Sequence, residues 1–542
     1  MRKTRPLLKW DRVPGFLCDW HLAGLFDPGL QHNPAPDLFQ KKISLRWSED
    51  HLQPWGGSGA IADVPAHKAG GVDWEWSLLP LNWTPELSLL RSRDDFPAWA
   101  ERMNGRNPHT WDRAYFALAV VESPEDADAE LWFSGWDGCR LWINGQLSFD
   151  EHSYHHVIWD MERVGFRLKQ GLNSFLLQLD RDGCVARIAI PGAPQKLYAI
   201  RSVADGEAPT ARKVSAFAQM RRYAANLKVT NSYDGQLPLA EWQDQFREHF
   251  LRCLGPAPER STDLPSPKLI SHTKCNGYAR SRYHLAAEGD AEIPCYVLIP
   301  QKPNGRTLVV AHGHESPAKV VGEEPHTGSW RWVGKYTGNY GEQLAQRGFV
   351  VTLIHERGFG ERRDYFGSSD PCNAAAELAM TIGLTLPRLH IADLHLAYDF
   401  VRTFAGVDGN RIGLTGLSGG GTLTYLTAAF DERFKAAAEF CGMCRYTRYA
   451  TGLKGCGMQV VPGLFPVGDV GEVLSLIAPR PLLLVHGRLD SSFNVIEFRS
   501  IAEDTRRAYR AAGVEDRLTA EVIEMPHQYD IDAAEKFFLT WL

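Results

Sequence analysis

One serine of the chain lies in a setting that suits nucleophilic chemistry: Ser418, in the segment RIGLTGLSGGGTLTYLTAAF. Gly416 and Gly420 complete the pattern G-x-S-x-G around it, with an apolar run before it and a run of small residues after it. A serine on a sharp turn from a strand into a helix has strained backbone angles and stands exposed. Flanking glycines let neighbouring backbone pass without a Cβ clash. The pattern predicts Ser418 as a nucleophile, and a turn serine without a chemical role is the alternative.

A nucleophilic serine of this type needs an acid and a base, which follow it along the chain in the order Asp or Glu, then His. Asp490 lies in the loop after the apolar run PLLLVH, and His527 is the only histidine after His486. We therefore predict Asp490 as the acid and His527 as the base. The alternatives are that Asp490 caps the following helix, that Glu439 at the end of an earlier strand is the acid, and that His527 is a surface histidine.

The roles of these side chains follow from the movement of one proton. Neutral His527 takes the proton of Ser418 during attack, while Asp490 fixes the tautomer of the imidazole and stabilises its charged form. The developing oxyanion needs fixed amide donors, each of which contributes roughly 2.7–4 kcal/mol in comparable sites. We predict the amide of Gly419 as one donor. The second is expected from the HG loop (residues 312–315, HGHE), with the amide of His314 favoured.

A fold must hold these residues together, and the second half of the chain has a pattern of strands and helices that predicts one. Apolar strand-length runs alternate with helical patterns there, which predicts a mostly parallel sheet covered on both faces. Such sheets place ligands at the carboxyl ends of their strands. The predicted strands are Thr307–Ala311, Phe349–Ile354, Arg411–Thr415, Ala436–Cys441, Pro481–His486 and Leu518–Ile523. The predicted helices are Tyr340–Arg347, Leu389–Ala405, Gly419–Ala429, Ile496–Ala512 and Ala533–Leu542.

The first half of the chain has a different texture, rich in Trp, Gly and Asp. Short aromatic and β-branched runs between turn signals such as Asn144-Gly145 favour an antiparallel β-sandwich. A polar stretch and two predicted helices, Lys213–Leu227 and Leu239–Leu254, separate the halves. We therefore divide the chain into a β-sandwich domain (1–200), a helical linker (201–268) and a catalytic domain (269–542).

The second half resembles α/β-hydrolases of the dienelactone-hydrolase-like or acetyl-xylan-esterase-like type. The matching segments are AHGHE (311–315), RGFGERR (357–363), DGNRIGLTGLSGGG (408–421), APRPLLLVHGRLD (478–490) and MPHQ (525–528). The resemblance implies the α/β-hydrolase fold and hydrolysis of carboxylic esters through an acyl-enzyme, often on acylated sugars. The chain departs from it in two ways: His355-Glu356 stands where many relatives have Asp, and dienelactone hydrolases proper use a cysteine nucleophile.

Residues 10–195 resemble the jelly-roll, galactose-binding-like modules found beside many carbohydrate-active enzymes. The segments SGWDGCRLWINGQLSF and LKQGLNSFLLQL carry this resemblance. Such modules bind sugars in some proteins and are structural in others, and the sequence leaves both possibilities open.

Three further residues are candidates for substrate contact: Arg357, Trp330 and Trp332. Arg357 stands among charged residues of the segment RGFGERR, where it could hold an anionic substrate or belong to an internal ion-pair network, which we favour. The two tryptophans follow the HG loop and line a substrate pocket or cover the core.

Composition narrows the class of partner. The net charge is -6 and no basic run occurs, which argues against nucleic acid as the main partner. The sequence contains no run of about 18 apolar residues, so we expect no membrane helix. The basic start is not followed by an apolar stretch of signal-peptide length. The ten scattered cysteines favour reduced thiols in the cytoplasm. We expect no metal and no cofactor, and we interpret His152, His155 and His156 as solvated and the Cys441–Cys444 pair as core thiols.

Together these features predict a cytoplasmic serine carboxylesterase that acts on a small ester, with an acylated carbohydrate as the leading candidate. A serine peptidase or amidase of the same fold is one alternative. A carbohydrate-binding protein with a vestigial hydrolase domain is another. The acyl group, the alcohol and the oligomeric state are left open.

Overall fold

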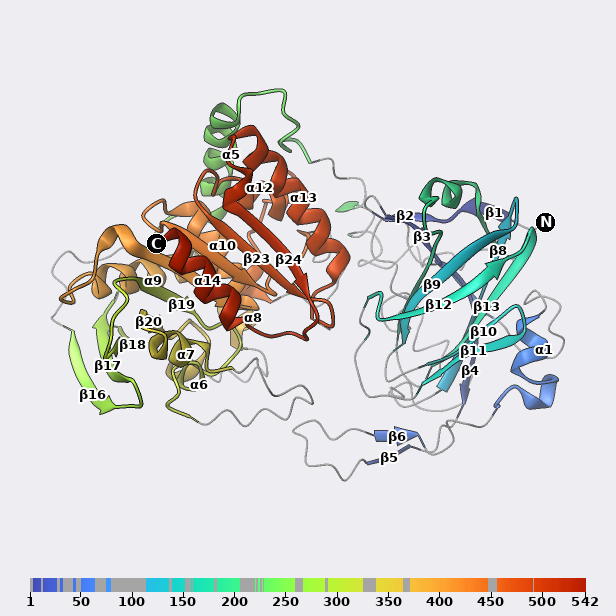
Figure 1. Cartoon of the computed structure of the whole chain (residues 1–542), viewed down its shortest axis with the longest axis horizontal. Coiled ribbons are helices and arrows are strands. Elements are labelled where there is room, and N and C mark those ends of the chain that lie inside the picture. Colours follow the sequence, from blue (N-terminus) through green and yellow to red (C-terminus); the bar gives the residue numbers. More distant parts are fainter. Residues whose placement is uncertain are drawn as a thin grey trace. The chain divides into compact units, whose positions relative to one another are not determined.

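The computed structural model describes most of the chain, which divides into two compact units, Met1–Leu227 and Lys228–Tyr449 with Lys454–Leu542 (Figure 1). The residues outside the description are 1–2, 11–12, 27–29, 33–41, 45–49, 64–74, 79–113, 136–138, 152–156, 158, 180–182, 205–219, 221–222, 225–226, 228, 259–266, 288–290, 325–337, 364–370, 447–455 and 491.

The first unit is a β-sandwich, as its sequence predicts. One sheet has the strand order β1-β15-β8-β13-β10-β11, with β4 also paired to β8 and β7 paired to β4, and the other has the order β12-β9-β14-β3-β2, all antiparallel. The inner faces meet through aromatic rings: Phe166 on β12 packs edge-on against Phe175 on β13, with centroids 5.4 Å apart. Asn144 and Gly145 both have positive φ and make the tight turn between β10 and β11.

The strands of this unit are β1 Lys3–Pro6, β2 Leu8–Trp10, β3 Val13–Phe16, β4 Asp19–Phe26, β5 Leu30–His32, β6 Lys42–Ser44, β7 Glu75–Leu78, β8 Ala114–Ser123, β9 Ala127–Gly135, β10 Cys139–Ile143, β11 Gln146–Glu151, β12 Glu162–Leu168, β13 Gly171–Leu179, β14 Cys184–Ala189 and β15 Arg201–Ala204. A short helix, α1, covers Ser58–Ala62.

The second unit is built on one mixed sheet with the order β16-β17-β18-β20-β19-β21-β22-β23-β24. The strands β19 to β24 pair in parallel, as predicted, whereas β16, β17 and β18 form an antiparallel meander that joins the sheet at β20. The strands are β16 Lys268–Lys274, β17 Tyr278–Ala286, β18 Glu292–Pro300, β19 Thr307–Ala311, β20 Val350–Ile354, β21 Ile412–Leu417, β22 Ala436–Phe440, β23 Leu482–Gly487 and β24 Leu518–Ile523.

Helices cover both faces of this sheet (Figure 1). On β19, Val309 and Ala311 belong to one apolar cluster, while Leu308 and Val310 belong to another. Because neighbouring side chains of a strand point to opposite faces, the two clusters lie on the two sides of the sheet. The helices are α5 Leu239–Leu254, α6 Pro317–Val320, α7 Tyr340–Gln346, α8 Pro371–Thr381, α9 Leu386–Val401, α10 Gly419–Phe430, α12 Val470–Ser475, α13 Val495–Ala511 and α14 Ile531–Trp541.

Helix α5 has the bounds that its periodicity predicts, and its place in the molecule explains that pattern. Trp242, Phe246, Phe250 and Leu254 are buried in the core of the second unit. The predicted linker, residues 201–268, contains this helix, and the structure assigns residues from Lys228 onward to the second unit. The helix predicted over Lys213–Leu227 lies mostly outside the described residues. No helix in the described part of the chain combines the length and apolarity needed to cross a membrane.

Candidate active site

Ser418 occupies the turn between β21 and α10, where its backbone has φ 62° and ψ −124°. Non-glycine residues rarely adopt such a positive φ, and holding one there costs of order 1–3 kcal/mol. The Ser418 amide donates a hydrogen bond to the carbonyl of Phe440 on β22, at 2.8 Å. The residue is half-buried. The turn therefore holds a strained serine at the carboxyl end of a central strand.

The neighbouring glycines make this turn possible because other backbone segments pass very close to it. A Cβ on Gly420 would lie 2.2 Å from the carbonyl oxygen of Ala311, and one on Gly416 would lie 2.6 Å from the same atom. Real Cβ atoms do not approach backbone so closely. The two glycines of the G-x-S-x-G pattern thus let β19 and α10 pack against the turn.

The strain at Ser418 predicts that Ser418→Gly is more stable than Ser418→Ala, by about 1 kcal/mol, although both lack the hydroxyl. Glycine tolerates positive φ, and its larger unfolded-chain entropy offsets only part of the relief. Thermal melts of the two variants measure the difference.

Ser271 gives a control because it lies on the exposed strand β16, where its φ is not positive and glycine gains nothing over alanine. There the alanine variant should be the more stable of the pair. A Ser418→Gly variant no more stable than Ser418→Ala would contradict the strain.

The HG loop lies directly against the serine turn. Gly313 has φ 66°, and a Cβ on it would lie 2.6 Å from the amide nitrogen of Gly420. A Cβ on Gly419 would lie 3.1 Å from Nδ1 of His314. Neither the amide of Gly419 nor that of His314 donates a hydrogen bond to any residue that the structure describes. The two predicted oxyanion donors therefore come from adjoining segments and have no partner in the described protein.

The buried carboxyl group of Glu356 holds the HG loop through hydrogen bonds to its backbone amides. Oε1 of Glu356 accepts hydrogen bonds from the amides of His312 and Gly313, at 2.8 and 3.2 Å. The Glu356 amide in turn donates to Nε2 of His312, at 3.0 Å. Burial raises the pKa of Glu356 to about 8 and lowers that of His312 well below its usual value. Both side chains are thus held largely uncharged at neutral pH while they fix the loop.

Asp490 and His527 meet at the carboxyl ends of β23 and β24. Nδ1 of His527 lies 2.8 Å from Oδ2 of Asp490. The other oxygen, Oδ1, accepts from the amides of Ser492 and Phe493 at 2.7 and 3.1 Å. Burial opposes ionisation of Asp490, but the contact with His527 outweighs it and keeps the pKa of the carboxyl below its usual value. The aspartate is therefore ionised at neutral pH and oriented toward the imidazole.

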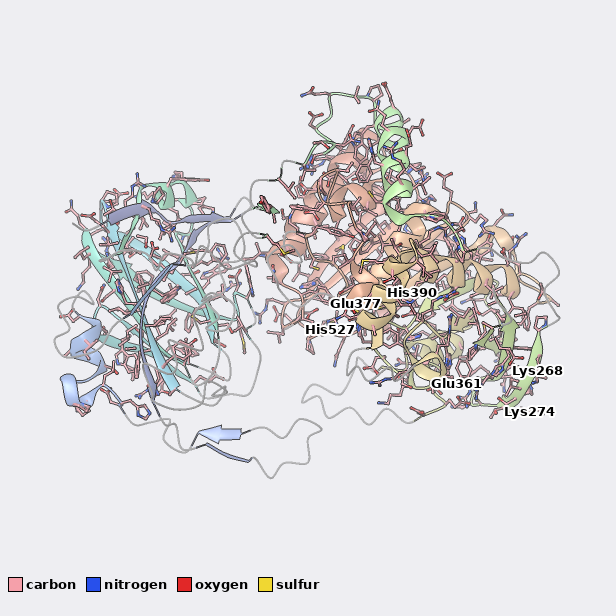
Figure 2. The ribbon with its side chains drawn as sticks, turned by 180° about the vertical axis from the view of Figure 1, so that it is seen from behind. Lys268, Lys274, Glu361, Glu377, His390 and His527 are labelled. Carbon is pink, nitrogen blue, oxygen red and sulfur yellow. The ribbon has the colours of Figure 1, made fainter. Side chains whose placement is uncertain are left out.

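His527 remains accessible on the loop between β24 and α14. Its side chain is 21% exposed, and its ring stacks on Phe493 with centroids 5.7 Å apart. In Figure 2 it lies well away from the edge strand β16, whose ends are Lys268 and Lys274. The imidazole is thus held at Nδ1 by Asp490 and on one face by Phe493.

Glu439, the rival acid, has a different environment. It is fully buried on β22, where one carboxyl oxygen accepts from the amide of Gly442. The imidazole of His527 is paired with Asp490 and not with Glu439. Burial raises the pKa of Glu439 to about 8, so the group holds its proton at neutral pH. A neutral acid is poorly suited to stabilise an imidazolium.

The raised pKa of Glu439 predicts that Glu439→Gln becomes more stable relative to the parent as pH rises. The unfolded parent loses this proton near its ordinary pKa of 4.5, whereas the folded parent keeps it up to about pH 8. The parent's stability therefore falls across that window, and glutamine has no proton to lose. The gain should reach a few kcal/mol, since each pKa unit corresponds to about 1.36 kcal/mol.

Thermal melts of both proteins at about pH 5 and about pH 8.5 test this. Glu356 titrates equally in both and cancels in the difference. The exposed Glu377 on α8 provides the control substitution, Glu377→Gln, which should show no such trend (Figure 2). A Glu439→Gln gain that is constant with pH would contradict a neutral Glu439.

Comparison with known proteins finds a family for part of the second unit. Residues 332–515 match the model of the dienelactone hydrolase family. The chain carries a domain of the dienelactone hydrolase family. Its sheet, with helices on both faces, is the α/β-hydrolase fold that the sequence predicts, and the family assigns the domain to the hydrolases.

Several individual proteins are similar to this domain. The chain is 27% identical over 276 residues to YtaP of Bacillus subtilis (strain 168), a provisionally named hydrolase, which covers 50% of this chain and 89% of that protein. A provisionally named acetyl xylan esterase from Bacteroides fragilis NCTC 9343 has 16% identity and a TM-score of 0.47, covering 59% of this chain and 84% of that one. A glucuronoyl esterase from Solibacter usitatus has 16% identity and a TM-score of 0.42, covering 58% and 98%.

Arg357 of the dienelactone hydrolase family domain takes part in a buried ion-pair network. Its guanidinium makes two hydrogen bonds of 2.9 Å to Asp393, and Arg362 makes a third of 2.7 Å. Burial would raise the pKa of Asp393, but the two arginines outweigh it and hold the pKa below its usual value. This pairing favours the structural interpretation of Arg357 over substrate contact. His390 adds a contact to the Arg357 carbonyl, at 3.3 Å.

Some residues singled out in the sequence lie outside the part of the chain that the structure describes. Trp330 and Trp332 lie outside the described residues, as do His152, His155 and His156. The support that Glu356 and His312 give to the HG loop was not predicted from the sequence. The signal that could have found it is His355-Glu356, which stands where many relatives have Asp. A carboxyl group just after β20 lies beside the HG loop, because that loop follows the neighbouring parallel strand β19.

Proposed function

We propose that this protein is a serine carboxylesterase that acts through an acyl-enzyme, with Ser418 as nucleophile, His527 as base and Asp490 as the acid that orients the base. The family supports hydrolase chemistry. The single observation that carries the finer proposal is the 2.8 Å contact between Nδ1 of His527 and Oδ2 of Asp490, at the carboxyl ends of β23 and β24. The strained turn of Ser418 lies at the carboxyl end of β21 in the same sheet. The chain order Ser, Asp, His is that of α/β-hydrolases.

In this mechanism the neutral imidazole of His527 removes the proton of Ser418 as its oxygen attacks the ester carbonyl. Asp490 stabilises the imidazolium, and the amides of Gly419 and His314 donate to the oxyanion. Collapse of the intermediate releases the alcohol, which receives the proton from His527. His527 then takes a proton from water as the water oxygen attacks the acyl-enzyme. It returns this proton to the oxygen of Ser418 when the carboxylic acid leaves.

For the substrate we propose a small ester, with an acylated carbohydrate as the leading class. The support is the resemblance of the second half to acetyl-xylan-esterase-like hydrolases and of the first half to galactose-binding-like modules. The net charge of -6 speaks against a nucleic acid partner. The ten cysteines are all free thiols, which fits a cytoplasmic, reducing location.

A substrate panel tests this proposal. The purified chain is assayed with p-nitrophenyl acetate, acetylated xylo-oligosaccharides, a feruloyl ester, a methyl glucuronoyl ester, a lactone and a set of peptide p-nitroanilides. The proposal expects ester cleavage, with the highest kcat/KM among the acylated sugars. Cleavage of the anilides with no ester turnover would replace it with a peptidase. Sugar binding without hydrolysis of any compound would leave a binding protein.

A further inference from the structure

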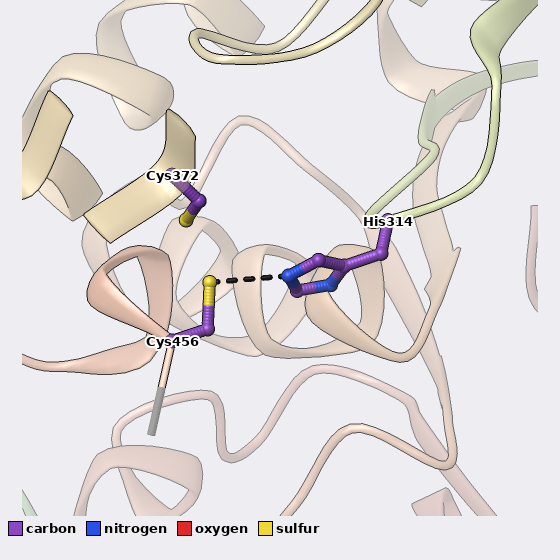
Figure 3. A group of neighbouring side chains, drawn as sticks. All are labelled: His314, Cys372 and Cys456. Atoms are coloured by element: carbon purple, nitrogen blue, oxygen red, sulfur yellow. Dashed lines mark hydrogen bonds between the residues drawn. The ribbon is translucent and has the colours of Figure 1, made fainter. Parts of the chain in front are cut away.

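Three side chains with metal-binding atoms meet beside the serine turn, and none of them is used in the proposed mechanism through its side chain. They are His314 of the HG loop, Cys372 at the start of α8, and Cys456 just before the short helix Gly457–Gln459 (Figure 3). Their ligand atoms all lie within 4.8 Å of one another, and Nε2 of His314 is 3.1 Å from the sulfur of Cys456. Three separate segments of the domain therefore direct an imidazole and two thiols at one point.

The two cysteine segments are held against each other by contacts that do not involve the thiols. Oδ1 of Asn373 accepts a hydrogen bond from the amide of Gly457, at 2.6 Å. A Cβ on Gly457 would lie only 2.2 Å from that of Ala376 on α8, so a glycine is needed for this close approach. The cluster is thus pre-arranged by the residues that follow each cysteine.

Imidazole and thiolate are the ligands that Zn²⁺ prefers. With Zn–S of about 2.3 Å and Zn–N of about 2.0–2.1 Å, tetrahedral ligands lie roughly 3.5–3.8 Å apart. The separation of 3.1 Å between His314 and Cys456 and the upper limit of 4.8 Å for the other pairs are close to that range, so small side-chain rotations would give the tetrahedral geometry. Cys372 is buried, Cys456 is half-buried and His314 is exposed, which leaves a path by which an ion can enter.

From this geometry we infer that His314, Cys372 and Cys456 bind one Zn²⁺ ion, with the fourth position open to water. Binding requires both thiols as thiolates, so two protons are released for each ion bound, and the two negative charges balance the charge of the metal. The ion ties the HG loop to α8 and to the segment around Cys456. A zinc site here does not depend on the proposed esterase activity.

A second group, Cys441, His486 and Asp490, also has its ligand atoms within 4.8 Å of one another. Asp490 is already engaged with His527 and with two backbone amides. All three residues are buried, so the described residues offer an ion no exposed ligand at this place. We therefore favour the cluster around Cys456 as the metal site. A substitution of Cys441 tests whether the second group binds the ion instead.

The experiment is a metal titration of the full chain, reduced and freed of metal with a chelator that is then removed. Co²⁺ reports thiolate ligation through its charge-transfer absorption, and Zn²⁺ affinity is measured by competition with a chromophoric chelator. The variants are Cys372→Ser and Cys456→Ser, with Cys275→Ser as a matched, half-buried thiol that packs against the other apolar cluster and Cys441→Ala for the rival group. Proton release is followed in weakly buffered solution near pH 7.

The inference predicts saturation at one ion per chain with a thiolate band and release of two protons. Cys372→Ser and Cys456→Ser should each weaken Zn²⁺ binding by more than about 100-fold, because loss of even an outer-shell partner costs about 10–100-fold. Cys275→Ser and Cys441→Ala should bind as the parent does. The absence of a thiolate band, or loss of binding in Cys441→Ala but not in Cys456→Ser, would overturn it. Since Cys456 is half-buried, its variant remains informative if Cys372→Ser fails to fold.

Discussion

Replacing Ser418 by alanine is expected to lower kcat for a short acyl ester such as p-nitrophenyl acetate by about 10⁶-fold, as loss of the nucleophile does in comparable serine hydrolases. In the proposed mechanism the hydroxyl is the atom that attacks the ester carbonyl, so its removal leaves the base without the group it activates. The fold should persist, because the side chain is small and half-buried and makes no hydrogen bond that caps α10. Initial rates with the parent and the variant, at matched concentration and with circular dichroism to check folding, provide the measurement.

A serine at a neutral position serves as the control for this substitution. Ser271 lies on β16, where every residue is exposed, so Ser271→Ala should retain the parent rate. If Ser418→Ala hydrolysed the ester within tenfold of the parent while folded, the assignment of the nucleophile would be wrong.

The second large effect is expected from Asp490→Asn, which should lower kcat by about 10⁴-fold, as the equivalent change does in a well-studied triad. The asparagine amide would donate where Nδ1–H of His527 now donates, so the imidazole would take the wrong tautomer or lose its orientation. The charge that stabilises the imidazolium would also be lost. KM should change little, because Asp490 is buried behind His527 and is not available to the substrate.

The discriminating control is Glu439→Gln, the same chemical change at the rival acid. Glu439 holds its proton at neutral pH because burial raises its pKa to about 8, so this substitution should leave kcat within about tenfold of the parent. The opposite pattern, a large loss with Glu439→Gln and a small one with Asp490→Asn, would transfer the role of the acid to Glu439.

Much of the site could be predicted because local sequence carries the necessary signals. The strand before Ser418, the glycines around it and the small residues after it describe a strand–turn–helix unit without reference to the rest of the fold. The histidine was predictable because the order of the triad leaves His527 as the only choice after His486. Parallel strands such as β19 and β20 could also be predicted, since they are buried along their whole length and most of their residues are apolar.

What the sequence could not provide depends on contacts between distant segments. The pairing of Arg357 with Asp393 joins a loop to a helix, and neither partner indicates the other in the sequence. The cluster of His314, Cys372 and Cys456 has no spacing that matches a metal motif, because each ligand comes from a different segment. The antiparallel strands β16 and β17 were not predicted because β16 is exposed along its whole length and β17 is half-buried along much of it, unlike the buried parallel strands.

The most direct test of the central claim is covalent labelling with a fluorophosphonate probe, followed by mass spectrometry of the digested protein. The account predicts one adduct per chain, carried by the oxygen of Ser418, and at least about 100-fold slower labelling when His527→Ala removes the base. An adduct on a different residue, or no adduct on a folded protein that still hydrolyses esters, would contradict it.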